Sequence, residues 1–194
     1  MKEVSINNQA KLSPHFSLGE LTKTKFKTED GNIPSHVAIE NLRRICEDWL
    51  EELRYRYNVL YGAENGGKQC GTTREGQAPS DVGDDHSGAS PCVSPEEPII
   101  INHGYRSPQV SKAMAKAGYK PSSTSNHLTG CAVDIRCLGK EQALRYAAIL
   151  LDIADGTKQD FDELFIEWNA RGSIWLHFAV RPQNNRRKIA FMAG

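Results

Sequence analysis

The chain has 194 residues, and its 24 lysines and arginines balance 24 aspartates and glutamates. A neutral chain argues against a nucleic-acid-binding protein that relies on a broad basic surface. A content of 39% hydrophobic and 25% charged residues excludes a wholly disordered chain and a collagen-like one. No apolar run approaches the roughly 18 residues of a membrane span, and the N-terminus lacks the apolar segment of a secretory signal. We therefore expect a protein without a membrane span, held in the cytoplasm of the producing cell or released by lysis.

Five cysteines cannot all pair within one chain. Cys131 and Cys137 belong to one expected strand and lie roughly 20 Å apart, which is too far for a disulfide. These two and Cys46 are expected to be small buried hydrophobic residues. Only Cys70 and Cys92 fall in a loop where pairing is plausible.

The clearest helix is expected over residues 35–57, where Ser35 supplies a start signal. Its apolar stripe recurs at helical spacing: Ala38, Leu42, Ile45, Trp49 and Leu53. Residues 62–97 then contain seven glycines and three prolines. We interpret this segment as a loop insertion in a single domain covering 1–194, because each flank is too small for a separate fold.

The second half is expected to be rich in strands, at 98–102, 131–137, 163–168, 173–180 and 188–192. Ser107 and Pro108 start a short helix that ends at Gly118. Residues 140–155 form another helix with one face made by Leu144, Ala147, Leu151 and Ala154, ending at Gly156. Helices early and strands late predict an α+β fold, with a mainly antiparallel central sheet and helices packed on one side.

Strand phase places titratable side chains opposite the apolar residues of three strands. Asp134 alternates with Val133 and Ile135, and His177 alternates with Leu176 and Phe178. Glu163 and Glu167 likewise lie opposite Leu164 and Ile166. If these strands are neighbours, one face of the sheet carries a polar site.

His127 lies seven residues before Asp134, and Gly130 between them permits a turn that returns the imidazole over the carboxylate. Two imidazoles and one carboxylate leave a fourth position open, which is typical of a catalytic zinc site. The alternatives are ordinary: His127 as a polar loop residue, Asp134 facing solvent, and His177 as a core histidine.

Three motifs together resemble the zinc D-Ala-D-Ala carboxypeptidase and murein endopeptidase family, which shares its fold with the hedgehog signalling domain. They are Asn102-His-Gly-Tyr-Arg-Ser107, Ser125-x-His127-x-x-Gly130-x-Ala132-x-Asp134 and Trp175-x-His177. The opening Leu12-Ser-Pro-His-Phe-Ser-Leu-Gly-Glu-Leu21 is similar to the phage and prophage endolysin branch. The resemblance covers most of the chain except 62–97.

The resemblance implies one zinc ion held by His127, Asp134 and His177. It implies that Arg106 stabilises the oxyanion, as a permanently charged group with several N–H donors can. Ser125 matches a serine that helps to hold substrate near the metal, although capping a local turn is almost as strong an alternative. Tyr105 and Trp175 fall in the same motifs and are candidate substrate-binding residues.

The general base departs from the family pattern. Many members carry a glutamate three residues before the last histidine ligand, where this chain has Ile174. Glu167 is the best substitute, since strand phase directs it to the same face, and His103 is the reserve candidate. Glu163 lies further along the strand and is expected to contribute less.

The expected function is that of a monomeric zinc metallopeptidase, a hydrolase of peptidoglycan stem peptides in cell wall degradation. The bond cleaved, by D,D-carboxypeptidase or L,D-endopeptidase activity, stays open. The alternative is a metal-containing but non-catalytic cell-wall-binding protein, or a virion or prophage component.

Overall fold

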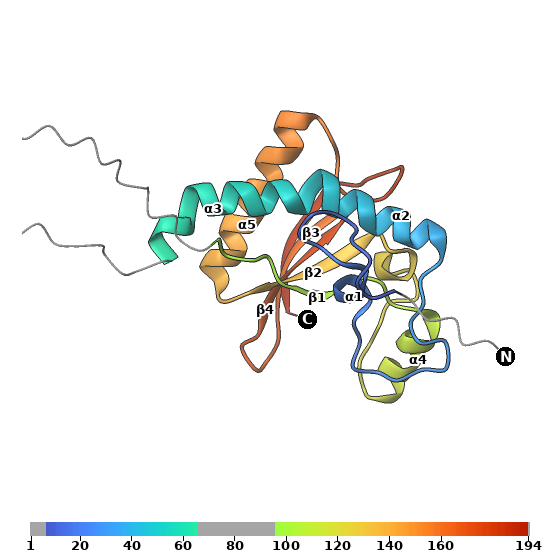
Figure 1. The fold of residues 1–194 in the computed structure, drawn as a ribbon. Helices are drawn as coiled ribbons and strands as arrows, with labels where there is room; N and C mark the ends of the chain where they lie inside the picture. Colours follow the sequence, from blue (N-terminus) through green and yellow to red (C-terminus); the bar gives the residue numbers. More distant parts are fainter. Residues whose placement is uncertain (1–6, 66–95, 194) are drawn as a thin grey trace, which may run out of the picture.

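The computed structural model describes residues 7–65 and 96–193. The helical elements are α1 (Leu18–Thr22), α2 (His36–Ile45), the π-helical turn η1 (Cys46–Leu50), α3 (Glu51–Asn65), α4 (Pro108–Lys116), the 3-10 turn η2 (Asn126–Thr129) and α5 (Lys140–Thr157). The strands are β1 (Ile101–His103), β2 (Ala132–Cys137), β3 (Glu163–Trp168), β4 (Ile174–Ala179) and β5 (Lys188–Ala193). This is an α+β arrangement, as the sequence predicted (Figure 1).

The five strands form one sheet in the order β1-β2-β4-β3-β5. The first three pairings are antiparallel, while β5 runs parallel to β3, so the sheet is mixed rather than antiparallel. The chain leaving β4 crosses back to the start of β3, where Arg187 N donates to Phe161 O and Lys188 N donates to Asp162 O. That crossing makes β5 begin at the same end as β3, which strand periodicity alone does not reveal.

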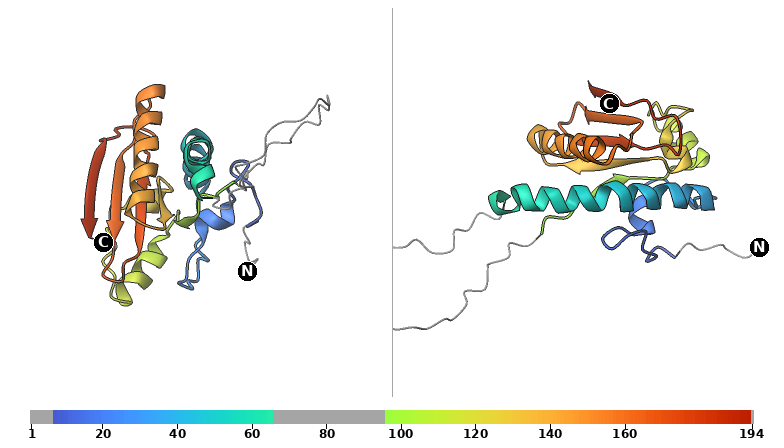
Figure 2. Two further views of the ribbon diagram at one scale, coloured as in Figure 1. Left: turned by 90° about the vertical axis from the view of Figure 1, so that its left-hand side faces the viewer. Right: turned by 90° about the horizontal axis from the view of Figure 1, so that it is seen from above.

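The large helices cover one face of the sheet (Figure 2). α5 packs against β3 and β4, and α3 packs beside α5. Trp49 in η1 lies between both layers, with its ring centroid 5.0 Å from that of Phe178 and 6.5 Å from that of Phe161. The core therefore sits between this face and the helices, which leaves the other face for polar side chains.

α2, η1 and α3 form one long helix that begins after Ser35, whose hydroxyl accepts from Ala38 N. All five residues of the expected apolar stripe are buried. The helix continues to Asn65, so residues 62–65 belong to α3 rather than to the loop expected from 62 onward. Glu97 N donates to Asn58 Oδ1 at 2.7 Å, which ties the returning chain to α3.

Cys46, Cys131 and Cys137 are buried and unpaired, as expected from their apolar neighbours. Cys70 and Cys92 lie outside the described residues, as does most of the segment interpreted as an insertion. The pairing of these two cysteines stays a prediction.

α5 differs from its expected form in two ways. It passes through Gly156 and ends at Thr157, with Lys158 in the left-handed conformation at φ 58°. Its buried face is formed by Gln142, Ala143, Tyr146, Ile149, Leu150, Ile153 and Ala154, and Leu144 is exposed. No helix in the described part of the chain is long and apolar enough to cross a membrane.

Candidate metal centre

The sheet register brings Asp134 and His177 together. The two residues are direct partners on the adjacent strands β2 and β4, and both lie on the face away from the helices. His177 Nδ1 lies 2.9 Å from Asp134 Oδ1. The neighbouring Phe165 on β3 stacks its ring on the His177 imidazole, with 5.6 Å between centroids. Strand phase therefore predicted the correct face, and the register supplies the contact.

His127 reaches the same carboxylate from η2. Gly130 ends that turn at φ 70°, and a Cβ atom there would lie 2.4 Å from Ala38 O, so both the turn and the packing require glycine. His127 Nδ1 donates to Gly104 O at 2.7 Å, and its Nε2 lies 3.4 Å from Asp134 Oδ1. The expected return of His127 over Asp134 is present.

The ligand atoms of His127, Asp134 and His177 all lie within 4.8 Å of one another, and both histidines are buried. This group could hold a metal ion. Its donor set of two imidazoles and one carboxylate suits zinc, and a backbone carbonyl orients one imidazole as metal-binding histidines require. The geometry disfavours the ordinary alternatives, because Asp134 does not face open solvent and both histidines face a polar cluster.

The electrostatics of the group also favour a cation. Burial alone would raise the pKa of Asp134, but the charges of and hydrogen bonds from His127 and His177 hold it well below its usual range. Burial alone would lower the pKa of His177, but its contacts with Asp134 and Glu163 raise that pKa to about 10. The site thus stabilises positive charge between two carboxylates, and a divalent ion can take the place of protons there.

Glu163 contacts the candidate ligand His177 on the side of the ring away from Asp134, a role the sequence did not reveal. Its Oε2 lies 3.4 Å from His177 Nε2, the ring nitrogen that does not face Asp134. Asn126 Nδ2 donates to the same oxygen at 2.9 Å, and Arg186 Nη2 donates to Oε1 at 2.6 Å. The hydrogen bond from His177 and the charge of Arg186 lower the pKa of Glu163. Glu163 is therefore an anionic partner that orients His177.

The Glu163 contacts continue to a fully buried carboxylate, Asp162. It accepts from Asn126 Nδ2 at 2.7 Å, from Arg186 Nε at 2.7 Å and from Arg186 Nη2 at 2.6 Å. Arg181 Nε lies 2.9 Å from its Oδ2. The side chains behind His177 are thus fixed by several charge-assisted hydrogen bonds.

Arg106 and Ser125 contact each other beside His127. Arg106 Nη2 donates to Ser125 Oγ at 2.8 Å, and Arg106 N donates to His127 O at 3.1 Å. Ser125 precedes η2, but its side chain forms no capping bond there, so its hydroxyl serves the guanidinium. Burial lowers the pKa of Arg106, and the Asp134 charge opposes this effect. Arg106 is thus a desolvated cation near the centre.

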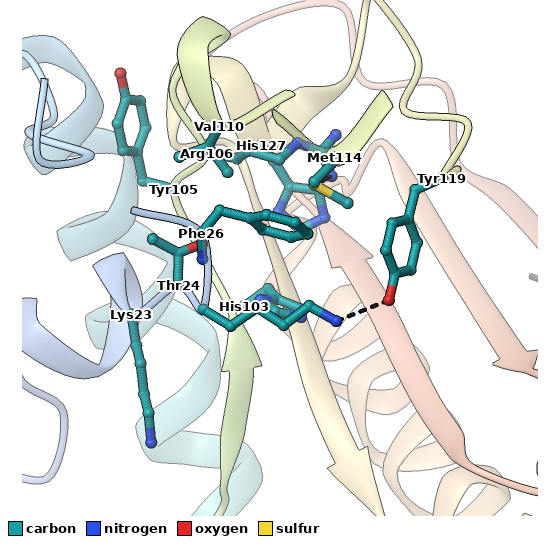
Figure 3. A pocket seen from close by; sticks show the side chains of 11 residues that line it. Lys23, Thr24, Phe26, His103, Tyr105, Arg106, Val110, Met114, Tyr119 and His127 are labelled. Atoms are coloured by element: carbon teal, nitrogen blue, oxygen red, sulfur yellow. Dashed lines mark hydrogen bonds between the residues drawn. The ribbon is translucent and has the colours of Figure 1, made fainter. Parts of the chain in front are cut away.

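The other candidate residues are divided between two parts of the site. Trp175 Nε1 donates to Glu167 Oε2 at 2.5 Å, across the pairing of β3 and β4. Tyr105 is held by a bond from its N to Leu21 O at 2.6 Å, and its side chain lines a hollow beside His127 (Figure 3). Trp175 therefore directs a carboxylate, whereas Tyr105 forms part of a wall.

Two groups near the centre can act as a base. Burial, with the nearby Asp134 charge, raises the pKa of Glu167, which makes its carboxylate a better proton acceptor. His103 is the β1 partner of Asp134. Desolvation lowers the His103 pKa, and the charges of His127 and Arg106 lower it further against the opposing charge of Asp134. Ile174 packs against the core and supplies no base.

Comparison of the chain with protein-family models, with curated proteins and with solved structures finds no match.

Proposed function

We propose that the protein is a zinc metallopeptidase that hydrolyses peptide bonds in peptidoglycan stem peptides, on a fold like that of the hedgehog and DD-peptidase domains. The observation that carries the proposal is the convergence of His127, Asp134 and His177, with a partly buried guanidinium and a carboxylate of raised pKa close by. Bound zinc would supply Lewis-acid catalysis and a water molecule of lowered pKa.

The residues of the chain supply the remaining chemistry. Glu167 accepts the proton of the attacking water and passes it to the leaving amine, with its carboxylate directed by Trp175 Nε1. Arg106, held by Ser125, donates to the oxyanion that forms at the scissile carbonyl. Glu163 keeps the His177 ring in a single orientation throughout.

The test is Glu167→Gln, which keeps the size of the side chain and an acceptor for Trp175 but cannot take up the proton. We expect this variant to retain zinc and thermal stability while muropeptide cleavage falls by about 100-fold or more. Digestion of purified murein with and without a chelator, followed by mass analysis of the products, measures the cleavage. His103→Ala is the companion variant.

The outcomes separate the candidates. Undiminished cleavage by Glu167→Gln with loss of cleavage in His103→Ala would transfer the role of base to the histidine. A wild-type protein that binds zinc but cleaves no muropeptide would instead be a non-catalytic wall-binding protein, which the absence of a base at Ile174 favours.

A further inference from the structure

β5 forms one edge of the sheet, and within the described residues no strand pairs with its outer side (Figure 2). Lys188 N donates to Asp162 O, toward the interior of the sheet. Because successive residues of a strand direct their N–H and C=O groups to opposite sides, those of Ile189, Phe191 and Ala193 face outward. Edge strands are usually protected from further pairing by charges, prolines or bends. β5 is six residues long and carries a single charge, at its first position, so its outer edge is open to another strand.

The helix side of β5 is apolar and largely uncovered. Ile189 and Phe191 are the register partners of the buried Leu164 and Ile166 on β3, so they lie on the face of the sheet that the helices cover. α5 packs over β2, β3 and β4, and it leaves Ile189 53% and Phe191 62% exposed. Single exposed apolar residues are ordinary, but here two successive positions on one face of an edge strand are involved.

A groove between α5 and β5 continues this apolar surface. It has a volume of about 370 Å³, and its walls include Phe191 on β5 and Leu144 on α5. Leu144 is 49% exposed and lies outside the face of α5 that the sheet buries. Trp168 and Lys140 line the groove as well, with the lysine Nζ 5.5 Å from the centroid of the indole ring. The free edge and the groove therefore form one continuous surface.

The edge of β5 is complementary to a second copy of itself. In an antiparallel pairing with Ala190 on a twofold axis, Ile189 lies opposite Phe191 of the partner subunit, on each side of the axis. These are residues whose N–H and C=O groups face outward, so the pairing satisfies them. It also joins apolar side chains to apolar side chains on the helix side.

Charge favours the same register. Lys188 would lie opposite Met192 of the partner subunit, and Met192 is the register neighbour of Glu167 on β3. The ammonium group of each copy would thus approach a carboxylate of the other copy over one intervening strand. The two backbones are then about 10 Å apart, which two long side chains can span. A parallel pairing in register would instead place the two lysines side by side, which is unfavourable.

We propose that a second copy of this chain covers the surface, and that the protein is a twofold-symmetric dimer whose two sheets join at β5 into one continuous sheet. The same edge is used by both copies, so the assembly closes at two. The inference departs from the monomer expected from the sequence. It goes beyond the proposed function and does not depend on it.

Sedimentation velocity of the full chain over a wide range of concentration tests the proposal. We expect wild type to reach twice the mass of the chain, and Phe191→Glu to raise the dimer dissociation constant by about 100-fold or more, since it buries two charges in an apolar contact. Leu60→Glu is the matched control, because Leu60 is 58% exposed but lies on α3. A wild type that is monomeric at every concentration would overturn the proposal, as would equal dissociation constants for the two variants.

A cross-linking experiment tests the register and does not depend on the folding of Phe191→Glu. Directly opposed residues of antiparallel strands have Cβ atoms about 4.5–5.5 Å apart, closest at a non-hydrogen-bonded pair such as the one on the axis. We therefore expect Ala190→Cys to form a covalent dimer on mild oxidation. Ala193→Cys should not, since it would lie opposite Arg187 of the partner subunit, and oxidised wild type gives the baseline from the native cysteines. No cross-link in Ala190→Cys, or equal cross-linking of both variants, would refute the antiparallel pairing.

Discussion

Replacing Glu163 with glutamine should weaken zinc binding without removing any proposed zinc ligand. In the structure Glu163 Oε2 faces two donors, Asn126 Nδ2 and the distal nitrogen of His177. Glutamine lacks the negative charge and can offer its single carbonyl oxygen either to these donors or to Arg186, but not to both. Loss of an outer carboxylate behind a metal-binding histidine typically reduces affinity by about 10–100-fold, equivalent to about 1.4–2.7 kcal/mol. We expect a decrease in this range.

Competition with a chromophoric zinc chelator at fixed pH measures the affinity. The control is Glu141→Gln, which also removes one carboxylate paired with an arginine, but at an exposed position on α5. Denaturation of both metal-free variants shows how much of any change reflects folding. If Glu163→Gln binds zinc within about twofold of wild type, the carboxylate does not act on the metal through His177.

Three further predictions concern stability and reactivity. Trp49→Ala should lower the free energy of unfolding by about 3–5 kcal/mol, measured by urea denaturation, because it leaves a cavity where the buried indole packs the long helix against the sheet. Burial alone would raise the pKa of Asp162, but the hydrogen bonds from Arg186 and Asn126 lower it. The stabilisation from Asp162 is therefore complete above the unfolded pKa of about 3.9 and is lost as the pH falls through the lower folded value. We expect Asp162→Asn to lower the free energy of unfolding by about 1.5–3 kcal/mol at pH 7. The same substitution should make the free energy of unfolding depend less on pH in the acid range. Burial raises the pKa of the Cys46 thiol, so alkylation mapped by mass spectrometry should reach it only in denaturant; rapid labelling of the native protein would refute this.

The part of the site that local pattern determines was predictable. Alternation of apolar and polar residues fixes the face on which Asp134 and His177 lie, because a one-residue shift would bury the charged side chains. Gly130 likewise marks the turn that carries His127 back to the sheet. The placement of these three residues can be predicted without the strand order, provided that the strands carrying Asp134 and His177 are neighbours.

What depends on distant pairing was not predictable. Phase placed Glu163 and Glu167 on the same face, but only the register shows that Glu163 reaches His177 while Glu167 lies opposite Trp175. The parallel direction of β5 follows from the way the chain crosses the start of β3. This crossing leaves no periodic pattern of apolar residues in the sequence that could predict it. On α5 two overlapping apolar stripes compete, and the sheet selects the one containing Tyr146 rather than Leu144.

The position of β4 has a consequence for biosynthesis. β4 lies between β2 and β3 in the sheet, although both of those strands precede it in the chain. A ribosome thus releases two of the three candidate metal ligands well before His177 emerges, and the gap between β2 and β3 stays open until then. Because such non-local strand insertion is slow compared with helix formation, we expect the helical layer to form first. A metal ion at this centre would then bind late, after most of the fold has formed, and would not be needed to start folding.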